Sequence, residues 1–238
     1  MEKFYKINDG KIYIPDNIKK VKLDIGLSIN APHSAIWLNN EPNDLLVFGF
    51  EPNPDSIEQI KGNKPYVKLW ENRIQDFSLV GNKLLIAECA LGLETKKTTL
   101  YVTGVDAGCS STYEPHPQFQ LMRPLEKKIT VEQYRLEEFF KIFPFEQIPY
   151  IEYIKIDAQG ADLDIIKSGG EYIKDYVVYV TLEPENNQYL GTNNSVNSIN
   201  DYMKSIGFQR INHSKTNDPT FINEKFINLK DNISIFQC

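Results

Sequence analysis

Short apolar runs alternate along the chain with stretches whose apolar residues recur at helical spacing. Runs that are apolar over nearly their whole length are typical of strands buried on both faces of a sheet. This alternation predicts an α/β fold with a mostly parallel sheet and helices on both faces. The predicted strands are 21–26, 45–51, 82–91, 151–157, 176–183 and 232–238, and the predicted helices are 32–40, 53–63, 135–143, 161–170 and 195–207.

One part of the chain departs from the alternation. Residues 97–104 and 127–134 are predicted to be extended. The segment between them contains GCSSTYEPHPQFQLMRP, which is too rich in Ser, Pro and Gly for regular structure. We therefore predict a single domain over 1–238, with an inserted hairpin or loop segment at about 97–132. Long loops in compact domains often cover a ligand site.

The composition of the chain excludes several classes of protein. The chain has 238 residues, of which 41% are apolar, and its formal net charge is −6. It lacks the basic face of nucleic-acid-binding proteins, so we expect no nucleic-acid partner. Its apolar runs are far shorter than the roughly 20 residues of a membrane span, and its start lacks a signal peptide. Three widely spaced cysteines support neither disulfides nor zinc. We expect a cytoplasmic protein with no membrane partner, and a homo-oligomer is compatible with the sequence.

Acidic residues gather where the predicted strands end. Ligands of open α/β sheets bind outside the carboxyl ends of the strands. A rim so rich in acids therefore predicts a binding site, because solubility alone does not require acids at one edge. The residues at these ends are Asp24 with Gly26, Glu51, Glu88, Asp157 and Glu183.

Glu51 suggests what the rim binds, since it lies 27 residues after Asp24 at the end of the neighbouring strand. A carboxylate there can accept hydrogen bonds from a ribose diol, although it can equally cap the helix at Asn53–Pro54 or pair with a lysine. The turn after Asp24 has one glycine, Gly26, in place of the G-x-G-x-x-G pyrophosphate cradle, which disfavours NAD or FAD. A nucleoside cofactor without pyrophosphate, such as S-adenosylmethionine, fits this turn better.

Four stretches carry a family resemblance: LDIGLSIN, FGFEPNP, AECALGLE and above all IEYIKIDAQGADLDIIKSGG. Together they resemble the FkbM family of S-adenosylmethionine-dependent methyltransferases, whose signature is K-I-D-x-E-G-x-E-x-x-x-L-x-G-A. The resemblance implies a Rossmann-like class I methyltransferase fold, with a seven-stranded sheet whose last strand is antiparallel. It also implies S-adenosylmethionine as cofactor, and O-methylation of a hydroxyl on a small molecule or a sugar or glycan.

The resemblance also assigns residues to the cofactor. It implies that the turn after the first strand faces the methionine part, that Glu51 holds the ribose, and that the third strand lies near the adenine. The residues so implied are Asp24, Gly26, Ser28, Asn30, Glu51, Pro52, Asn53, Glu88, Cys89 and Ala90.

The chain departs from the family pattern at several positions. Ser28 and Asn30 stand where the family turn has Asn and Gly, and Gln159 and Asp162 stand where the signature has Glu. These departures motivate an alternative, a methyltransferase-like binding or assembly module without catalytic activity.

Methylation of a hydroxyl requires a group that takes its proton. The candidates are Asp157, which the resemblance places below the methyl group, Glu183, and His116 in the inserted loop. Asp157 and Glu183 together are also candidate ligands of a divalent metal such as Mg²⁺. Tyr189, just past the fifth strand, is a candidate contact for the acceptor.

Overall fold

The computed structural model describes residues 1–64, 72–104, 106–185, 187–211, 218–230 and 233. Within them, seven strands form one sheet in the order β11-β12-β10-β9-β3-β4-β5. The sheet is mixed, because β10, β9, β3, β4 and β5 pair in parallel while β12 runs antiparallel to both neighbours. The strands are β3 (Lys20–Ile25), β4 (Leu45–Phe50), β5 (Leu84–Ala87), β9 (Ile151–Ile156), β10 (Val177–Leu182), β11 (Phe208–Ile211) and β12 (Thr220–Asn223).

The helices form where the sequence pattern places them, with two short additions, α3 (Pro117–Gln120) and α6 (Glu171–Tyr176). Pro32 and Pro54 occupy first-turn positions, where a missing N–H costs nothing. The short helix α6 and the strands β11 and β12 were not predicted, and the predicted strand at 232–238 lies outside the described residues except for residue 233. The helices are α1 (Pro32–Asn40), α2 (Pro54–Ile60), α4 (Leu136–Ile142), α5 (Asp162–Ser168), α6 (Glu171–Tyr176) and α7 (Val196–Ser205).

Two apolar layers cover the two faces of the sheet. Strand β4 is buried along its whole length, and its residues alternate between the layers. Phe48 packs in one layer with Phe139 of α4, while Val47 belongs to the other with Trp37 of α1. Helices α4, α5 and α7 contribute to the first layer, which confirms that helices cover both faces of the sheet.

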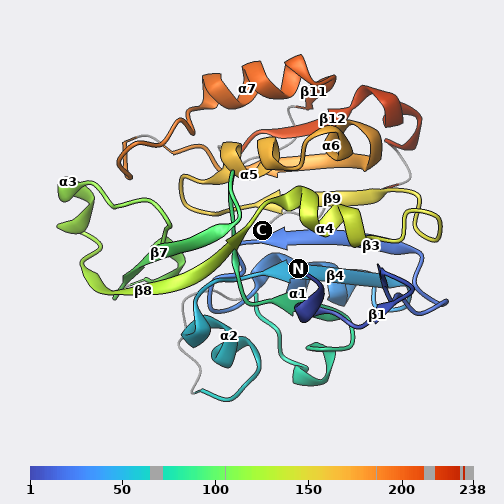
Figure 1. Ribbon diagram of the computed structural model, residues 1–238, viewed down its shortest axis with the longest axis horizontal. Coiled ribbons are helices and arrows are strands. Elements are labelled where there is room, and N and C mark those ends of the chain that lie inside the picture. The colour runs from blue at the N-terminus through green and yellow to red at the C-terminus, as the bar shows by residue number, and fades with distance from the viewer. Residues whose placement is uncertain (65–71, 105, 186, 212–217, 231–232, 234–238) are drawn as a thin grey trace.

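The predicted strand at 82–91 is interrupted. Strand β5 ends at Ala87, and the chain then enters β6 (Ala90–Leu91), which belongs to a separate three-stranded sheet. That sheet is completed by β7 (Lys96–Thr103) and β8 (Leu125–Tyr134), which pair antiparallel as the inserted hairpin. In Figure 1 the β7–β8 arm extends to the left of the main sheet, with α3 (Pro117–Gln120) at its far end. A two-stranded hairpin, β1 (Ile7–Asn8) and β2 (Lys11–Ile12), precedes β3.

No helix in the described part of the chain is long and apolar enough to cross a membrane.

Candidate active site

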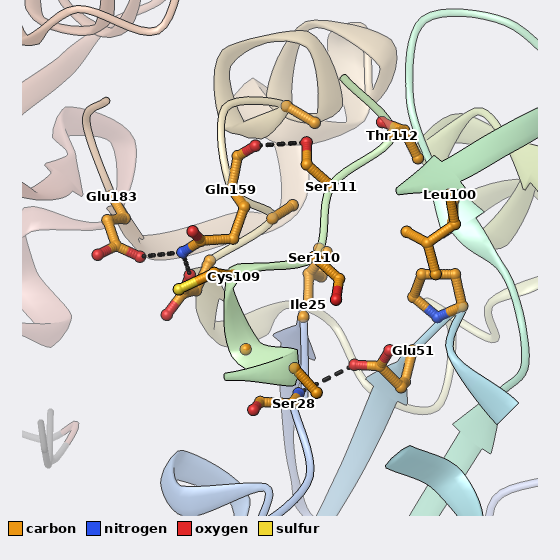
Figure 2. Close-up of a pocket in the computed structure, with 18 of the residues that line it drawn as sticks. Ile25, Ser28, Glu51, Leu100, Cys109, Ser110, Ser111, Thr112, Gln159 and Glu183 are labelled. Atoms are coloured by element: carbon orange, nitrogen blue, oxygen red, sulfur yellow. Dashed lines mark hydrogen bonds between the residues drawn. The ribbon is translucent and has the colours of Figure 1, made fainter. Parts of the chain in front are cut away.

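A cavity of about 630 Å³ lies at the carboxyl ends of β3, β4, β9 and β10, with the segment between β7 and β8 forming part of its wall. Figure 2 shows Ser28 and Glu51 on one side and Gln159 and Glu183 on the other, with Cys109 to Thr112 of the inserted segment between them. The parallel strands therefore bring three acids of the predicted rim, Glu51, Asp157 and Glu183, to one hollow.

The turn after β3 is shaped by left-handed backbone. Gly26, Ser28 and Ala31 have φ of +86°, +55° and +46°. A Cβ on Gly26 would lie 1.9 Å from the carbonyl oxygen of Asp157, so only glycine fits between the ends of β3 and β9. The altered family position Asn30 does not have positive φ; the strain falls on Ser28 and Ala31 instead.

Glu51 holds this turn against the end of β4. Its Oε2 accepts a hydrogen bond from the Ser28 amide at 2.9 Å, and its Oε1 accepts one from the Asn53 amide at 2.8 Å. The side chain is only 6% exposed. Burial raises the pKa of Glu51 to about 8, although both backbone hydrogen bonds oppose the rise. The carboxyl thus both ties the two turns together and lines the cavity.

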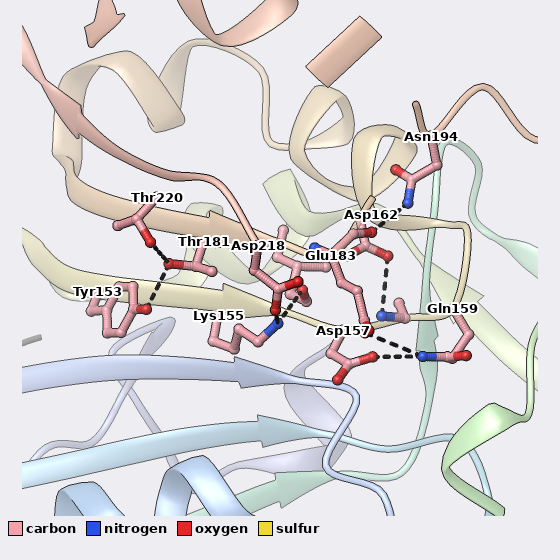
Figure 3. Close-up of polar contacts among 12 residues, drawn as sticks. Tyr153, Lys155, Asp157, Gln159, Asp162, Thr181, Glu183, Asn194, Asp218 and Thr220 are labelled. Carbon is pink, nitrogen blue, oxygen red and sulfur yellow. Dashed lines mark hydrogen bonds and ion pairs between the residues drawn. The ribbon is translucent and has the colours of Figure 1, made fainter. Parts of the chain in front are cut away.

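Gln159 links the two predicted catalytic carboxyls. Its Nε2 donates to Oδ1 of Asp157 at 2.9 Å and lies 3.2 Å from Oε2 of Glu183 (Figure 3). Its Oε1 accepts from the Tyr189 hydroxyl at 2.8 Å, and its carbonyl accepts from the Ser111 hydroxyl at 2.7 Å. The residue therefore joins β9 and β10 to the inserted segment.

Asp157 and Glu183 divide one proton between them. Burial raises the pKa of Glu183, and its hydrogen bond with ionised Asp157 raises it further. Burial also opposes ionisation of Asp157, but the hydrogen bond from Glu183 and the charge of Lys155 outweigh it and lower the pKa of Asp157. Near neutral pH, the pair is therefore an Asp157 carboxylate beside a protonated Glu183.

Asp162 fixes the backbone beneath this pair. Its Oδ2 accepts from the Ala158 amide at 3.1 Å, and its Oδ1 accepts from the Glu183 amide at 2.9 Å. The side chain is fully buried at the start of α5. One carboxyl thus joins the ends of β9 and β10, a role that its position in the sequence does not reveal.

The structure brings most of the predicted cofactor-binding and catalytic residues to the cavity wall and leaves five outside it; Tyr189, the predicted acceptor contact, is also not part of the wall. The predicted residues that line the cavity are Gly26, Ser28, Glu51, Pro52, Cys89, Ala90, Asp157 and Glu183. Those that do not are Asp24, Asn30, Asn53, Glu88 and His116.

Three of the five residues outside the cavity have structural roles close to it. Asp24 is buried and accepts hydrogen bonds from the amide and hydroxyl of Ser34, which fixes the first turn of α1. Asn53 caps α2 by accepting from the Asp55 amide. Asn30 lies against a separate small hollow beside Ile74.

The other two residues face solvent or cap a helix. Glu88 is exposed and pairs with Lys61, with its Oε1 2.9 Å from Nζ. His116 caps α3 through Nδ1, which accepts from the Gln118 amide at 3.3 Å. The structure therefore does not place His116 where it can act as a base in the cavity.

His33, in the first turn of α1, lines the cavity; its place at the start of the predicted helix allowed either a surface residue or a substrate contact near the cofactor. Burial lowers its pKa to about 4, so its imidazole is neutral. Several other residues of the cavity were missed by sequence reasoning. Asp106 and Arg123 come from the inserted segment, and Glu185 follows β10. The sequence contained one indication of Asp106 and Arg123, namely the expectation that the inserted segment covers the site.

Three buried polar atoms on the cavity wall have no hydrogen-bond partner among the described residues. They are Ser28 Oγ, Arg123 Nε and Glu185 Oε2. Unpaired buried polar groups are costly, and in native proteins they commonly mark a ligand or water site. These three atoms, on different parts of the wall, are candidate contacts of a ligand or of water.

Asp157 and Glu183 do not fit a metal ion. The Gln159 amide group points its hydrogens at both carboxyls, whereas Mg²⁺ requires oxygen acceptors directed towards it. In the described parts of the chain, no group of three or more His, Cys, Asp or Glu side chains could hold a metal. The predicted metal site is therefore not supported.

A mixed sheet with an acid-lined cavity at the carboxyl ends of its parallel strands is the arrangement found in α/β proteins that bind ligands at the strand ends. The sequence model of the methyltransferase FkbM domain matches residues 31–210, more than half of the chain. The chain therefore belongs to the FkbM methyltransferase family, as its motifs indicated.

A solved structure has the same fold. The chain is similar to the crystal structure of methyltransferase FkbM from Methylobacillus flagellatus KT, with a TM-score of 0.51 and 12% identity. The match covers 92% of this chain and 46% of that chain, so the protein spans about half the length of the one it resembles. No curated protein matches the chain.

Proposed function

We propose that this protein is an S-adenosylmethionine-dependent O-methyltransferase whose acceptor is a hydroxyl of a small molecule or a sugar. The observation that carries the proposal is one cavity with Glu51 beside the left-handed turn at one end and the Asp157–Glu183 pair at the other. The first feature suits a nucleoside, and the second supplies a base.

The residues around Glu51 fit the cofactor. Burial raises the pKa of Glu51 to about 8, and hydroxyls that donate to it favour its ionised form. The ionised group offers about four acceptor positions, of which two are used on backbone amides, which leaves room for ribose hydroxyls. Ser28 Oγ is buried and unpartnered in the described structure, ready for a polar group of the methionine part. Pro52, Cys89 and Ala90 give the adenine a mostly apolar wall.

Asp157 is the group that takes the proton of the acceptor hydroxyl. S-adenosylmethionine, when bound, supplies a methyl group on a cationic sulfonium that is open to in-line displacement. Asp157 is ionised because Glu183 and Gln159 both donate hydrogen bonds to it. A base so placed contributes about 10²–10⁴-fold to the rate. The rest of the acceleration comes from holding both reactants in one cavity that excludes water.

The proposal is tested with a thermal shift assay and a transfer assay. We expect S-adenosylmethionine and its demethylated product to raise the melting temperature of the wild type, whereas NAD does not. Glu51→Ala should abolish that shift, and Glu88→Ala, a control outside the cavity, should retain it. Transfer of tritiated methyl groups to hydroxylated acceptors should fall by at least about 10²-fold in Asp157→Asn.

The alternative class, a binding or assembly module without turnover, gives a different result. It is favoured if neither form of the cofactor changes the melting temperature of the wild type, and if the melting temperature of Glu51→Ala is equally unaffected by them. A shift with NAD alone would instead indicate an oxidoreductase.

A further inference from the structure

Glu185 is a buried acid with no evident role in the fold. Its side chain is 6% exposed, and its Oε2 has no hydrogen-bond partner among the described residues. Its backbone is held in place, because its amide donates to the Asn194 carbonyl at 3.0 Å. Glu185 is one of the residues that line the cavity. An unpaired carboxyl held rigidly at a cavity wall is the arrangement expected when a ligand completes its hydrogen bonds.

Glu185 lies at the end of the cavity away from Glu51. Glu51 follows β4 and Glu185 follows β10, and β3 and β9 lie between these strands in the sheet. Three strand spacings of about 4.8 Å separate the two ends by about 14 Å. Asp157, at the end of β9, lies between them. A nucleoside on Glu51 therefore leaves Glu185 to the acceptor.

The cavity wall is strongly acidic. Among the described residues that line it, the carboxyls outnumber the one arginine, Arg123. Arg123 itself lies near Cys109, where it opposes the rise that burial gives the pKa of that thiol. Burial raises the pKa of Glu51 and of Glu185 to about 8, and Glu183 holds a proton beside Asp157, so the like charge that an anionic acceptor meets comes mainly from the Asp157 carboxylate. Hydrogen-bond donors of an acceptor meet carboxyl oxygens along the wall. The acids that line the cavity are Glu51, Asp106, Asp157, Glu183 and Glu185.

We propose that Glu185 binds a hydrogen-bond donor of the acceptor, a hydroxyl or ammonium group next to the hydroxyl that is methylated. The acceptor is then an uncharged or cationic polyhydroxy compound, and phosphorylated or carboxylated compounds are disfavoured beside the Asp157 carboxylate. This inference rests on the proposed function, and it adds the class of acceptor and the residue that selects it.

The test uses the full chain and three panels of hydroxylated probes: neutral glycosides and polyols, amino sugars, and sugar phosphates with uronic acids. We expect transfer of tritiated methyl to members of the first two panels. Glu185→Gln should raise the acceptor KM by about tenfold or more while the cofactor Kd changes less than about twofold. A larger effect on amino sugars than on neutral glycosides would identify an ammonium as the group bound. Glu146→Gln, at an exposed position outside the cavity wall, should leave both constants unchanged.

A second variant separates binding from a structural role. Glu185→Met replaces the unpaired carboxyl by an apolar side chain of similar length, so the free protein should melt at the same or a higher temperature while acceptor use falls. A lower melting temperature in both variants, with acceptor KM unchanged, would show a structural role and overturn the inference.

The remaining outcomes are equally decisive. Transfer only to the anionic panel, or to none of the panels by a protein that binds the cofactor, overturns the inference about Glu185 without touching cofactor binding. Failure of the wild type to bind the cofactor overturns the proposed function itself.

Discussion

Among single residues, Gly26 links the sheet to the site. Its φ is +86°, and a Cβ at this position would lie 1.9 Å from the Asp157 carbonyl oxygen, which leaves no room for a side chain. Gly26 also opens the turn in which the Ser28 amide donates a hydrogen bond to Glu51. Its small size therefore lets β3 and β9 end close together at the cavity.

We predict that Gly26→Ala destabilises the protein by more than about 2 kcal/mol, because left-handed strain adds to a backbone clash. Gly10→Ala is the matched control, with φ of +75° and no atom within 4 Å of the added Cβ. It should cost only the strain, about 1–2 kcal/mol. Urea denaturation measures both variants, and equal losses would contradict the clash.

Gln159 is the second residue whose chemistry can be tested alone. Gln159→Glu would place a third carboxylate beside Asp157 and Glu183 in place of the amide that donates to both. We expect the variant to lose about 1–3 kcal/mol of stability at neutral pH through like-charge repulsion and lost hydrogen bonds.

The same variant should gain a metal response that the wild type lacks, because three carboxylates offer the oxygen ligands that Mg²⁺ prefers. Differential scanning fluorimetry with and without millimolar MgCl₂ measures it. An equal response of wild type and variant to MgCl₂ would show that the amide does not keep the cation out.

Among the elements, the segment after β10 depends on one asparagine. Asn194 Nδ2 donates to the Glu183 carbonyl at 2.7 Å, and its Oδ1 accepts from the Leu163 amide at 2.9 Å. It is 2% exposed. The side chain thus attaches the segment that carries Glu183 and Glu185 to the start of α5.

We predict that Asn194→Ala destabilises the protein by about 2–4 kcal/mol, because it leaves two buried backbone groups unpaired. The neighbouring Asn193→Ala is the control, since Asn193 is exposed and accepts only from the Ser198 hydroxyl among the interactions described. Chemical denaturation should separate the two variants clearly. A loss in Asn193→Ala as large as that in Asn194→Ala would argue against this attachment.

Helices and strands could be predicted where their pattern of apolar residues lies within the element itself. Strands β4, β9 and β10 are buried along their whole length, so their apolar runs mark them in the sequence. The break between β5 and β6 was missed because the apolar run continues through Cys89 while the chain changes sheets. Strand β12 was missed because its four residues depend on pairing with β10 and β11, and β10 is distant in sequence.

The sequence predicts which edge of the sheet carries the site, but it does not predict the contacts between the residues there. The carboxyl ends of parallel strands meet by topology, so Glu51, Asp157 and Glu183 could be located in advance. His33, Arg123 and Glu185 reach the cavity through packing of α1, the insertion and the segment after β10, and no spacing rule carries that information. His116 was misplaced because its loop reaches the cavity through other residues.

For the molecule as a whole, buried acids make stability depend on pH. Glu152, away from the cavity at the other end of β9, is 5% exposed, and its Oε2 has no partner among the described residues. Burial raises its pKa from 4.5 to about 7, although the charge of Lys22 opposes the rise. Between these values the folded protein keeps a proton that the unfolded chain has released, so stability falls as pH rises and levels off above about 7.

We predict that Glu152→Gln removes this contribution. The unfolding free energy of the variant relative to wild type should increase by on the order of 2 kcal/mol between about pH 4 and pH 8. Urea titrations at several pH values measure the difference. A constant difference across that range would show that Glu152 ionises alike in the folded and unfolded states.

Binding of a nucleoside cofactor at the acidic rim is tested most directly by a crystal structure of the protein with the demethylated cofactor. We predict both ribose hydroxyls within about 2.6–3.2 Å of the Glu51 carboxylate, with the sulfur directed towards Asp157. A nucleoside bound elsewhere, or a ribose that does not touch Glu51, would contradict it.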